Sequence, residues 1–105
     1  MNNGANAVGR KGLRPLVTLA ALLIPTVAIA LPTFQPNVDM KGLDYNHFDL
    51  PRPSARLCQE ACLADDQCQA WTFVRPTHFG PRATCWLKSR VPEGQSSACC
   101  VSGTR

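Results

Sequence analysis

The stretch "CQEACLADDQCQAW", residues 58–71, brings three cysteines into eleven positions and ends on a tryptophan. Its first part has the period of a helix, with Ser54 placed to act as the N-cap. The apolar face of this helix carries Leu57, Cys58, Ala61, Cys62 and Ala64. Leu63 falls on the polar face. The residues that follow, "QCQAWTFVR" (67–75), alternate and are rich in aromatic and β-branched side chains, which is typical of a strand.

Further strands are predicted on both sides of this unit. "TCWLKSR" (84–90) alternates, with Cys85 and Leu87 on one face. Trp86 and Lys88 lie on the other face. Weaker strand patterns occur at 34–40 and 98–103, and residues 46–53 read as an extended approach to the helix. Segments rich in Pro, Gly and Ser predict turns and loops at 41–44, 76–83 and 91–97. The fold class expected is α+β, with one short helix packed on an antiparallel sheet.

Residues 1–30 have the marks of a secretory signal peptide. A basic, polar start is followed by the apolar run "PLVTLAALLIPTVAIAL" (15–31), which contains the small residues Ala28 and Ala30 at the positions that a signal peptidase reads. Pro25 interrupts the run before it reaches the ~20 apolar residues of a spanning helix. We expect cleavage after Ala30 and a secreted or periplasmic bacterial protein that meets the membrane only through this peptide. An uncleaved anchor is the alternative.

The remaining 75 residues, 31–105, contain all six cysteines and a nearly balanced charge, with eight basic and seven acidic side chains. They contain no run of Lys or Arg that would track phosphates, so nucleic acid is not an expected partner. A chain of this length buries little apolar surface and commonly depends on cross-links or metals. Because export leads to an oxidising compartment, disulfides are the expected cross-links.

The cysteine spacing narrows the pairing. Cys58 and Cys62 lie one helical turn apart on the apolar face and do not readily bond each other. Cys68 follows a tight turn and can reach back to Cys62 at the helix end. Cys58 then needs Cys85 from the neighbouring strand.

Metal binding and catalysis are weaker interpretations. The C-x3-C pair lies inside a helix, and His47 and His78 have no partner at zinc-ligand spacing. A nucleophilic cysteine needs a base and an oxyanion hole, and His78 in a Pro/Gly loop is a poor base. The acidic residues Asp39, Asp44 and Asp49 match no calcium loop. We therefore expect no enzyme activity, no metal and no cofactor.

Several motifs together resemble a PAN/Apple domain of the compact bacterial kind. They are "GLDY" (42–45), "FDL" (48–50), C-x3-C-x5-C-x-A-W-T-F-V from Cys58, "CWLKS" (85–89) and the closing "SG" (102–103). The resemblance spans residues 39–104, with 31–38 as an N-terminal extension. It implies a short helix on a curved antiparallel sheet and the disulfides Cys58–Cys85 and Cys62–Cys68. It also implies a non-catalytic module that binds proteins or carbohydrates. The chain departs from the family in having no attached catalytic domain and in lacking the N-terminal cysteine of the longer Apple form.

Cys99 and Cys100 have no assigned role. They can form a ring between neighbours, bond another chain, stay reduced or join a different pairing. A structural role is the simplest interpretation, and a labile disulfide would suit a redox protein or redox sensor.

Alternation in the two central strands also predicts where a ligand would bind. If Cys68 and Cys85 face the helix, three rings share the opposite face: Trp71, Phe73 and Trp86. Arg75 and Lys88 lie near them. This face is either covered by the aromatic residues of 34–48 or open as a platform for a sugar or a protein partner.

The loop "RPTHFGPR" (75–82) is a second candidate surface because it presents Arg75, His78, Phe79 and Arg82. The sequence thus predicts an exported, non-catalytic binding module for a protein or carbohydrate partner. The alternatives are a small redox protein that uses Cys99 and Cys100, and an accessory or inhibitor subunit of a secreted enzyme.

Overall fold

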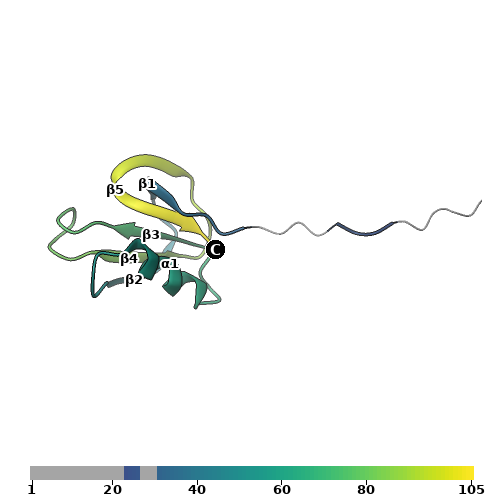
Figure 1. Ribbon diagram of the computed structural model, residues 1–105, viewed down its shortest axis with the longest axis horizontal. Coiled ribbons are helices and arrows are strands. Elements are labelled where there is room, and N and C mark those ends of the chain that lie inside the picture. Colours follow the sequence, from purple (N-terminus) through teal and green to yellow (C-terminus); the bar gives the residue numbers. More distant parts are fainter. Residues whose placement is uncertain (1–22, 27–30) are drawn as a thin grey trace, which may run out of the picture.

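The computed structural model describes residues 23–26 and 31–105 and contains one helix and a five-stranded antiparallel sheet (Figure 1). The elements are β1 (Gln35–Met40), β2 (Asp44–Asp49), α1 (Ala55–Leu63), β3 (Ala70–Val74), β4 (Thr84–Lys88) and β5 (Gly94–Thr104). The sheet is open and has the order β1-β5-β3-β4-β2. The α+β class is confirmed, whereas the curvature expected of the sheet stays a prediction.

The predicted signal peptide, residues 1–30, lies outside the described residues except for 23–26. In the described part of the chain, no helix has the length and apolar character needed to cross a membrane.

Helix α1 starts where the sequence predicts, directly after Ser54, but the Ser54 side chain makes no capping hydrogen bond. Leu63 is 45% exposed, as its place on the polar face predicts. The end of the helix is held from two sides. Tyr45 donates a 2.6 Å hydrogen bond to Asp65. The guanidinium of Arg105 donates to the carbonyl oxygens of Cys62 at 3.0 Å and Asp65 at 2.8 Å, which satisfies carbonyls that the helix end leaves free.

Strand β5 is longer than predicted. Residues 91–97 are rich in Gly, Ser and Pro and predict a loop, yet β5 begins at Gly94. Gly94, Gln95 and Ser96 pair with the end of β1, so hydrogen bonds to a distant strand override a weak local preference.

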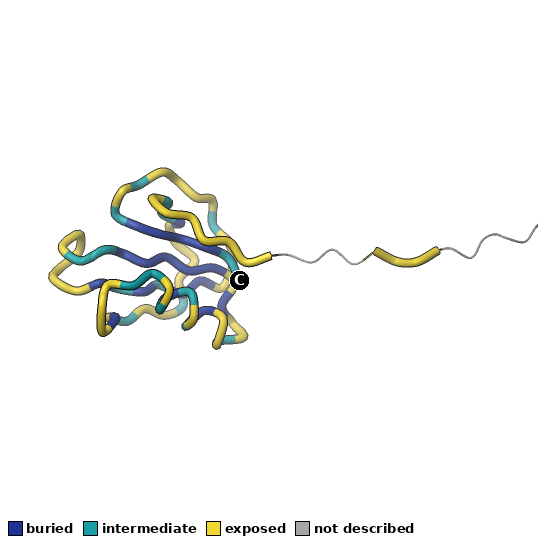
Figure 2. The backbone as a smooth tube through the Cα atoms, viewed as in Figure 1, coloured by how far each residue is buried: buried dark blue, intermediate teal, exposed yellow. Residues whose placement is uncertain are grey.

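The core lies between α1 and one face of the sheet. Its buried members are Leu50, Cys58, Cys62, Cys68, Trp71, Phe73, Ala83, Cys85, Leu87 and Val101. Figure 2 shows the buried stretches running along the central strands, with exposed backbone around them. Gly103 passes close to this core: a Cβ there would overlap the Trp71 ring and the carbonyl of Thr33. A larger residue at this position is therefore excluded by the packing of Trp71.

The prediction that Trp71, Phe73 and Trp86 share one face is wrong. Phe73 pairs with Cys85, and Trp71 pairs with Leu87, so both rings lie on the helix side. Trp86 pairs with Thr72 and lies on the other side. Alternation within each strand is as predicted. The error comes from Cys68 and Gln69, which precede β3 and do not continue its alternation.

The alternative of a covering N-terminal segment is right for the two rings on the helix side. The Phe34 ring lies 5.5 Å from the Trp71 ring between centroids. Tyr45 and Phe48 pack against the same core. Trp71 is fully buried and Phe73 is 5% exposed, so neither ring is available to a ligand.

Strands β1 and β5 bend together. In their ladder Pro36 pairs with Val101 and Val38 pairs with Ser96, so one residue of β1 stands opposite four of β5, residues 97–100. In Figure 1, β5 turns back on itself at this place. Asn37, the opposing residue, has a positive φ of 59°. The bend carries the end of β1 toward the side of the sheet that α1 leaves free.

Candidate binding site on the helix-free face

The face of the sheet opposite α1, here called the helix-free face, has polar and aromatic side chains. Thr72 and Val74 from β3 and Trp86 and Lys88 from β4 share it. Thr72 is buried beneath the end of β1, where its hydroxyl donates to the carbonyl oxygen of Met40 at 3.3 Å. Ser102 makes the same kind of bond, at 2.8 Å, to Val38. Part of this face is therefore covered by β1.

A pocket of about 220 Å³ occupies the part that β1 leaves open. Its lining comes from the end of β1, the β1–β2 turn and the start of β2, from β3 and β4, and from the β3–β4 loop. It consists of Asp39, Met40, Lys41, Gly42, Asp44, Thr72, Val74, Phe79, Trp86 and Lys88. Apolar rings, an ion pair and backbone groups thus border one concave surface. This combination is typical of pockets that bind and orient a ligand.

Lys88 fixes one wall of the pocket. Its ammonium donates to Asp44 Oδ1 at 2.5 Å and to the carbonyl oxygen of Gly42 at 3.1 Å, and the residue is only 2% exposed. The sequence places Lys88 at a binding surface as a cation near the rings. The structure uses that cation to hold the β1–β2 turn in place, so its hydrogen bonds are engaged. Gly42 has a φ of 88° in this turn, a conformation that glycine adopts without strain.

Trp86 is the aromatic residue of the pocket whose position is most fixed. The His47 ring stacks on it with centroids 4.3 Å apart and planes 14° apart. Its indole N–H donates to Thr84 Oγ1 at 3.1 Å. Because a β2 side chain and a β4 hydroxyl both hold the indole, Trp86 borders the pocket in a defined orientation.

Phe79 forms the outer rim of the pocket and is 73% exposed. It comes from the β3–β4 loop, where the His78 ring contacts it edge-on at 4.5 Å between centroids. The predicted second surface therefore joins the first at this point, because one loop residue borders the pocket beside Trp86.

A second hollow, of about 470 Å³, lies where the β3–β4 loop meets the bend of β5. Its lining is Arg75, Pro76, Thr77, His78, Ser97, Ala98 and Cys99. Arg75 is not a free cation here, because its guanidinium donates to the carbonyl oxygens of Ala98 at 2.6 Å and Cys100 at 3.3 Å. Arg82 lies elsewhere on the loop, exposed and 3.9 Å from Asp49.

The six cysteines form three disulfides. Cys58–Cys85 joins α1 to β4 with its Cα atoms 5.3 Å apart, and Cys62–Cys68 closes the turn after the helix with a distance of 5.2 Å. Both distances lie in the usual range. The third joins the neighbours Cys99 and Cys100 at the bend of β5.

The sequence does not indicate that two carboxylates line the pocket. Asp39 at the end of β1 and Asp44 at the start of β2 line it from either side of the β1–β2 turn, and Asp44 holds Lys88 there. The turn reaches the site only because β1 and β2 lie at opposite edges of the sheet, and a single sequence carries no local signal for that order. The residues "KGLD" (41–44) do predict a turn, but not what it faces.

Comparison with known families gives one match. The family model described as PAN domain matches residues 38–88, and no solved structure matches the chain. The matched segment contains β2, α1, β3 and β4 and the disulfides Cys58–Cys85 and Cys62–Cys68, whereas β5 lies beyond it. Residues 38–88 therefore match the PAN domain family, as the motifs of the chain indicate. PAN domains are in general protein-binding or carbohydrate-binding modules, not catalytic ones.

Proposed function

We propose that this PAN-family chain is an exported, non-catalytic binding module and that its protein or carbohydrate partner docks on the helix-free face, in the pocket beside Trp86. The observation that carries the proposal is the arrangement of this pocket. Trp86 is held in a fixed orientation by His47 and Thr84, next to a buried ion pair and below an exposed phenylalanine. A pre-oriented ring costs little conformational entropy when a ligand packs against it.

The same chemistry suits both classes of partner. A sugar ring stacks on an indole and donates hydroxyls to carboxylates such as Asp39 and Asp44. A protein partner would insert an apolar or cationic side chain between Trp86 and Phe79, because aromatic residues carry much of the binding energy at interfaces. The leader-like residues 1–30 support export. The three disulfides also support it, because disulfides persist in an oxidising compartment.

A screen with single variants tests the location of the site. Wild-type protein is applied to a glycan array and used in pull-downs from culture supernatant and cell-surface extract. Trp86→Ala is expected to fold and to lose at least about tenfold in affinity for the partner so found, which corresponds to 1.4 kcal/mol or more. Phe79→Ala should give a smaller loss.

Leu63→Ala is the matched control, because Leu63 is an exposed apolar residue on α1, on the other side of the sheet. Its affinity should equal that of the wild type. If Leu63→Ala abolishes binding and a folded Trp86→Ala does not, the partner docks on the helix side and the proposed site is wrong.

A further inference from the structure

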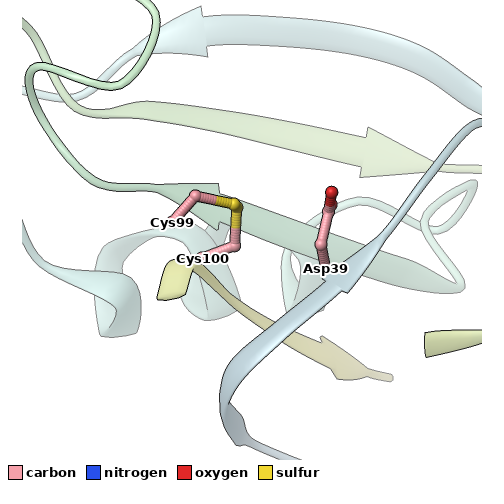
Figure 3. Close-up of side chains that lie close together, drawn as sticks. All are labelled: Asp39, Cys99 and Cys100. Carbon is pink, nitrogen blue, oxygen red and sulfur yellow. A yellow bond between two sulfur atoms is a disulfide. The ribbon is translucent and has the colours of Figure 1, made fainter. Parts of the chain in front are cut away.

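The third disulfide lies beside a carboxylate. Asp39 on β1 is the neighbour of Cys99 and Cys100 across the bend of β5, and Figure 3 shows its side chain next to the disulfide. One carboxylate oxygen and the two sulfur atoms all lie within 4.8 Å of one another. In the described part of the chain, the Asp39 carboxylate has no ion-pair partner. Two sulfur atoms from outside the segment that matches the family therefore converge with a free carboxylate from its first residues.

The backbone around the pair does not depend on the disulfide. Cys100 pairs with Val74 in the β3–β5 ladder, and the backbone amide of Arg75 donates to the carbonyl oxygen of Cys99 at 2.9 Å. The Arg75 guanidinium holds the carbonyl oxygens on both sides of Cys99. Opening the S–S bond would therefore leave both cysteines at the same place on the sheet, close to Asp39.

Access distinguishes this disulfide from the other two. Cys99 is half-buried and borders the 470 Å³ hollow, so a reductant can reach its sulfur. The four cysteines of the other disulfides are fully buried, with an exposed fraction of 0%. Thiol–disulfide exchange needs a thiolate to reach one of the sulfur atoms. A mild reductant should therefore open Cys99–Cys100 first.

We infer that Cys99, Cys100 and Asp39 form a reduction-dependent site for a thiophilic divalent metal ion such as Zn²⁺ or Cd²⁺. A dithiol reductant supplies two electrons and two protons, opens the S–S bond and leaves as its own disulfide. The two thiols then lose their protons to solvent as both sulfur atoms bind the metal, and one Asp39 oxygen completes three protein ligands. Water fills the fourth position of a tetrahedral ion.

The distances required are within reach of the observed positions. In a tetrahedral site with metal–sulfur bonds of ~2.3 Å, the two sulfur atoms stand ~3.8 Å apart and a carboxylate oxygen lies slightly closer to each. The Asp39 oxygen is already within 4.8 Å of both sulfur atoms. Opening the disulfide is thus the main movement needed.

The test uses the oxidised protein, treated with a limiting dithiol and then freed of it. Alkylation and mass measurement should show two modified thiols, at Cys99 and Cys100. Titration of this form with Cd²⁺ should give one bound ion per chain, seen as a thiolate-to-metal charge-transfer band in the ultraviolet. The oxidised protein should give no such band.

Three variants decide which groups bind the ion. Asp39→Asn should weaken Cd²⁺ binding by roughly tenfold or more, because a ligand is lost. Asp49→Asn, a carboxylate exposed at the far edge of the sheet, should leave it unchanged. The double variant Cys99→Ser with Cys100→Ser should bind no Cd²⁺ after the same treatment.

The inference fails if the limiting dithiol opens a buried disulfide first, or if the reduced protein gives no stoichiometric band. It also fails if Asp39→Asn binds Cd²⁺ as tightly as the wild type. Asp39 also lines the pocket beside Trp86, but Trp86 supplies no ligand to the ion, so Trp86→Ala should retain the Cd²⁺ band whether or not it loses its partner.

Discussion

Each face of the sheet carries a tryptophan and at least one disulfide, but their roles differ between the two faces. On the helix side, Trp71 is fully buried under Phe34 and Gly103, and two disulfides tie α1 to the strands and turn around it. On the helix-free face, Trp86 is only partly buried, and the one disulfide joins two neighbours in the chain.

The difference shows that the surroundings decide what a tryptophan or a disulfide does. A ring covered on every side contributes its burial to stability, whereas a ring with one accessible edge can contribute to binding. A disulfide that closes a long loop restricts the unfolded chain, whereas one between neighbours restricts almost nothing. We therefore expect perturbations on the helix side to affect folding and those on the helix-free face to affect function.

The largest expected difference is between the two tryptophans. Trp71→Ala should cost about 3–5 kcal/mol, because it empties the centre of the core. A loss of this size is comparable to the whole stability of a small domain, so the variant should be largely unfolded. Trp86→Ala should cost only about 1 kcal/mol, because its ring is partly exposed. Denaturant unfolding followed by circular dichroism measures both.

An equal loss of unfolding free energy in the two variants would contradict the proposed difference between the faces. If Trp71→Ala does not fold at all, Trp71→Phe replaces it in this measurement. It keeps an aromatic ring in the core and should lose less stability than Trp71→Ala and more than Trp86→Ala.

The disulfides give the next largest difference. Replacing Cys58 and Cys85 by Ala removes a cross-link between residues 27 apart in the chain, and loop-closure entropy predicts a loss of about 3.5 kcal/mol. Replacing Cys99 and Cys100 by Ala should cost less than about 1 kcal/mol. Thermal unfolding of the two double variants, beside the wild type, measures the difference. A destabilised Cys99/Cys100 variant would show instead that the bend of β5 depends on its disulfide.

The smallest of the three effects concerns the tie between β2 and the end of α1. Tyr45→Phe removes the hydrogen bond to Asp65 and should cost about 1 kcal/mol near neutral pH. Burial, together with this bond, raises the pKa of Tyr45 to about 12, and the bond lowers the pKa of Asp65 below its ordinary value of 3.8.

These two pKa shifts set the pH window for the Tyr45→Phe variant. The contribution of Asp65 is present above pH 3.8 and is lost as the pH falls through its lowered pKa. The contribution of neutral Tyr45 is present below pH 10.0 and is lost as the pH rises toward about 12. The gap in unfolding free energy between wild type and variant should therefore narrow at both ends. A gap that stays constant from pH 2 to pH 12 would mean that the bond contributes no stability.

The sequence predicts the elements of this fold better than their arrangement. The period of residues 55–63 indicates α1, and alternation indicates β3 and β4, because both signals are local. The face of Trp71 is mispredicted because Cys68 lies outside β3 and the chain bends at Gln69 between them. The side of the sheet that Cys68 faces therefore does not predict the side that Trp71 faces. The contact of Asp39 with Cys99 and Cys100 depends on pairing between distant strands, for which one sequence holds no local pattern.

The strand order also sets the order in which the chain assembles. β1 and β2 are neighbours in the sequence but end at opposite edges of the sheet, and β1 finds its partner only when Gln35 meets Ser102. Closing so large a loop costs entropy before any hydrogen bond is gained, whereas the β3–β4 hairpin and the loop from Cys62 to Cys68 close locally. We expect the helix-side half to collapse and oxidise first and β1 to dock last. The pocket would then be the final part of the molecule to take shape.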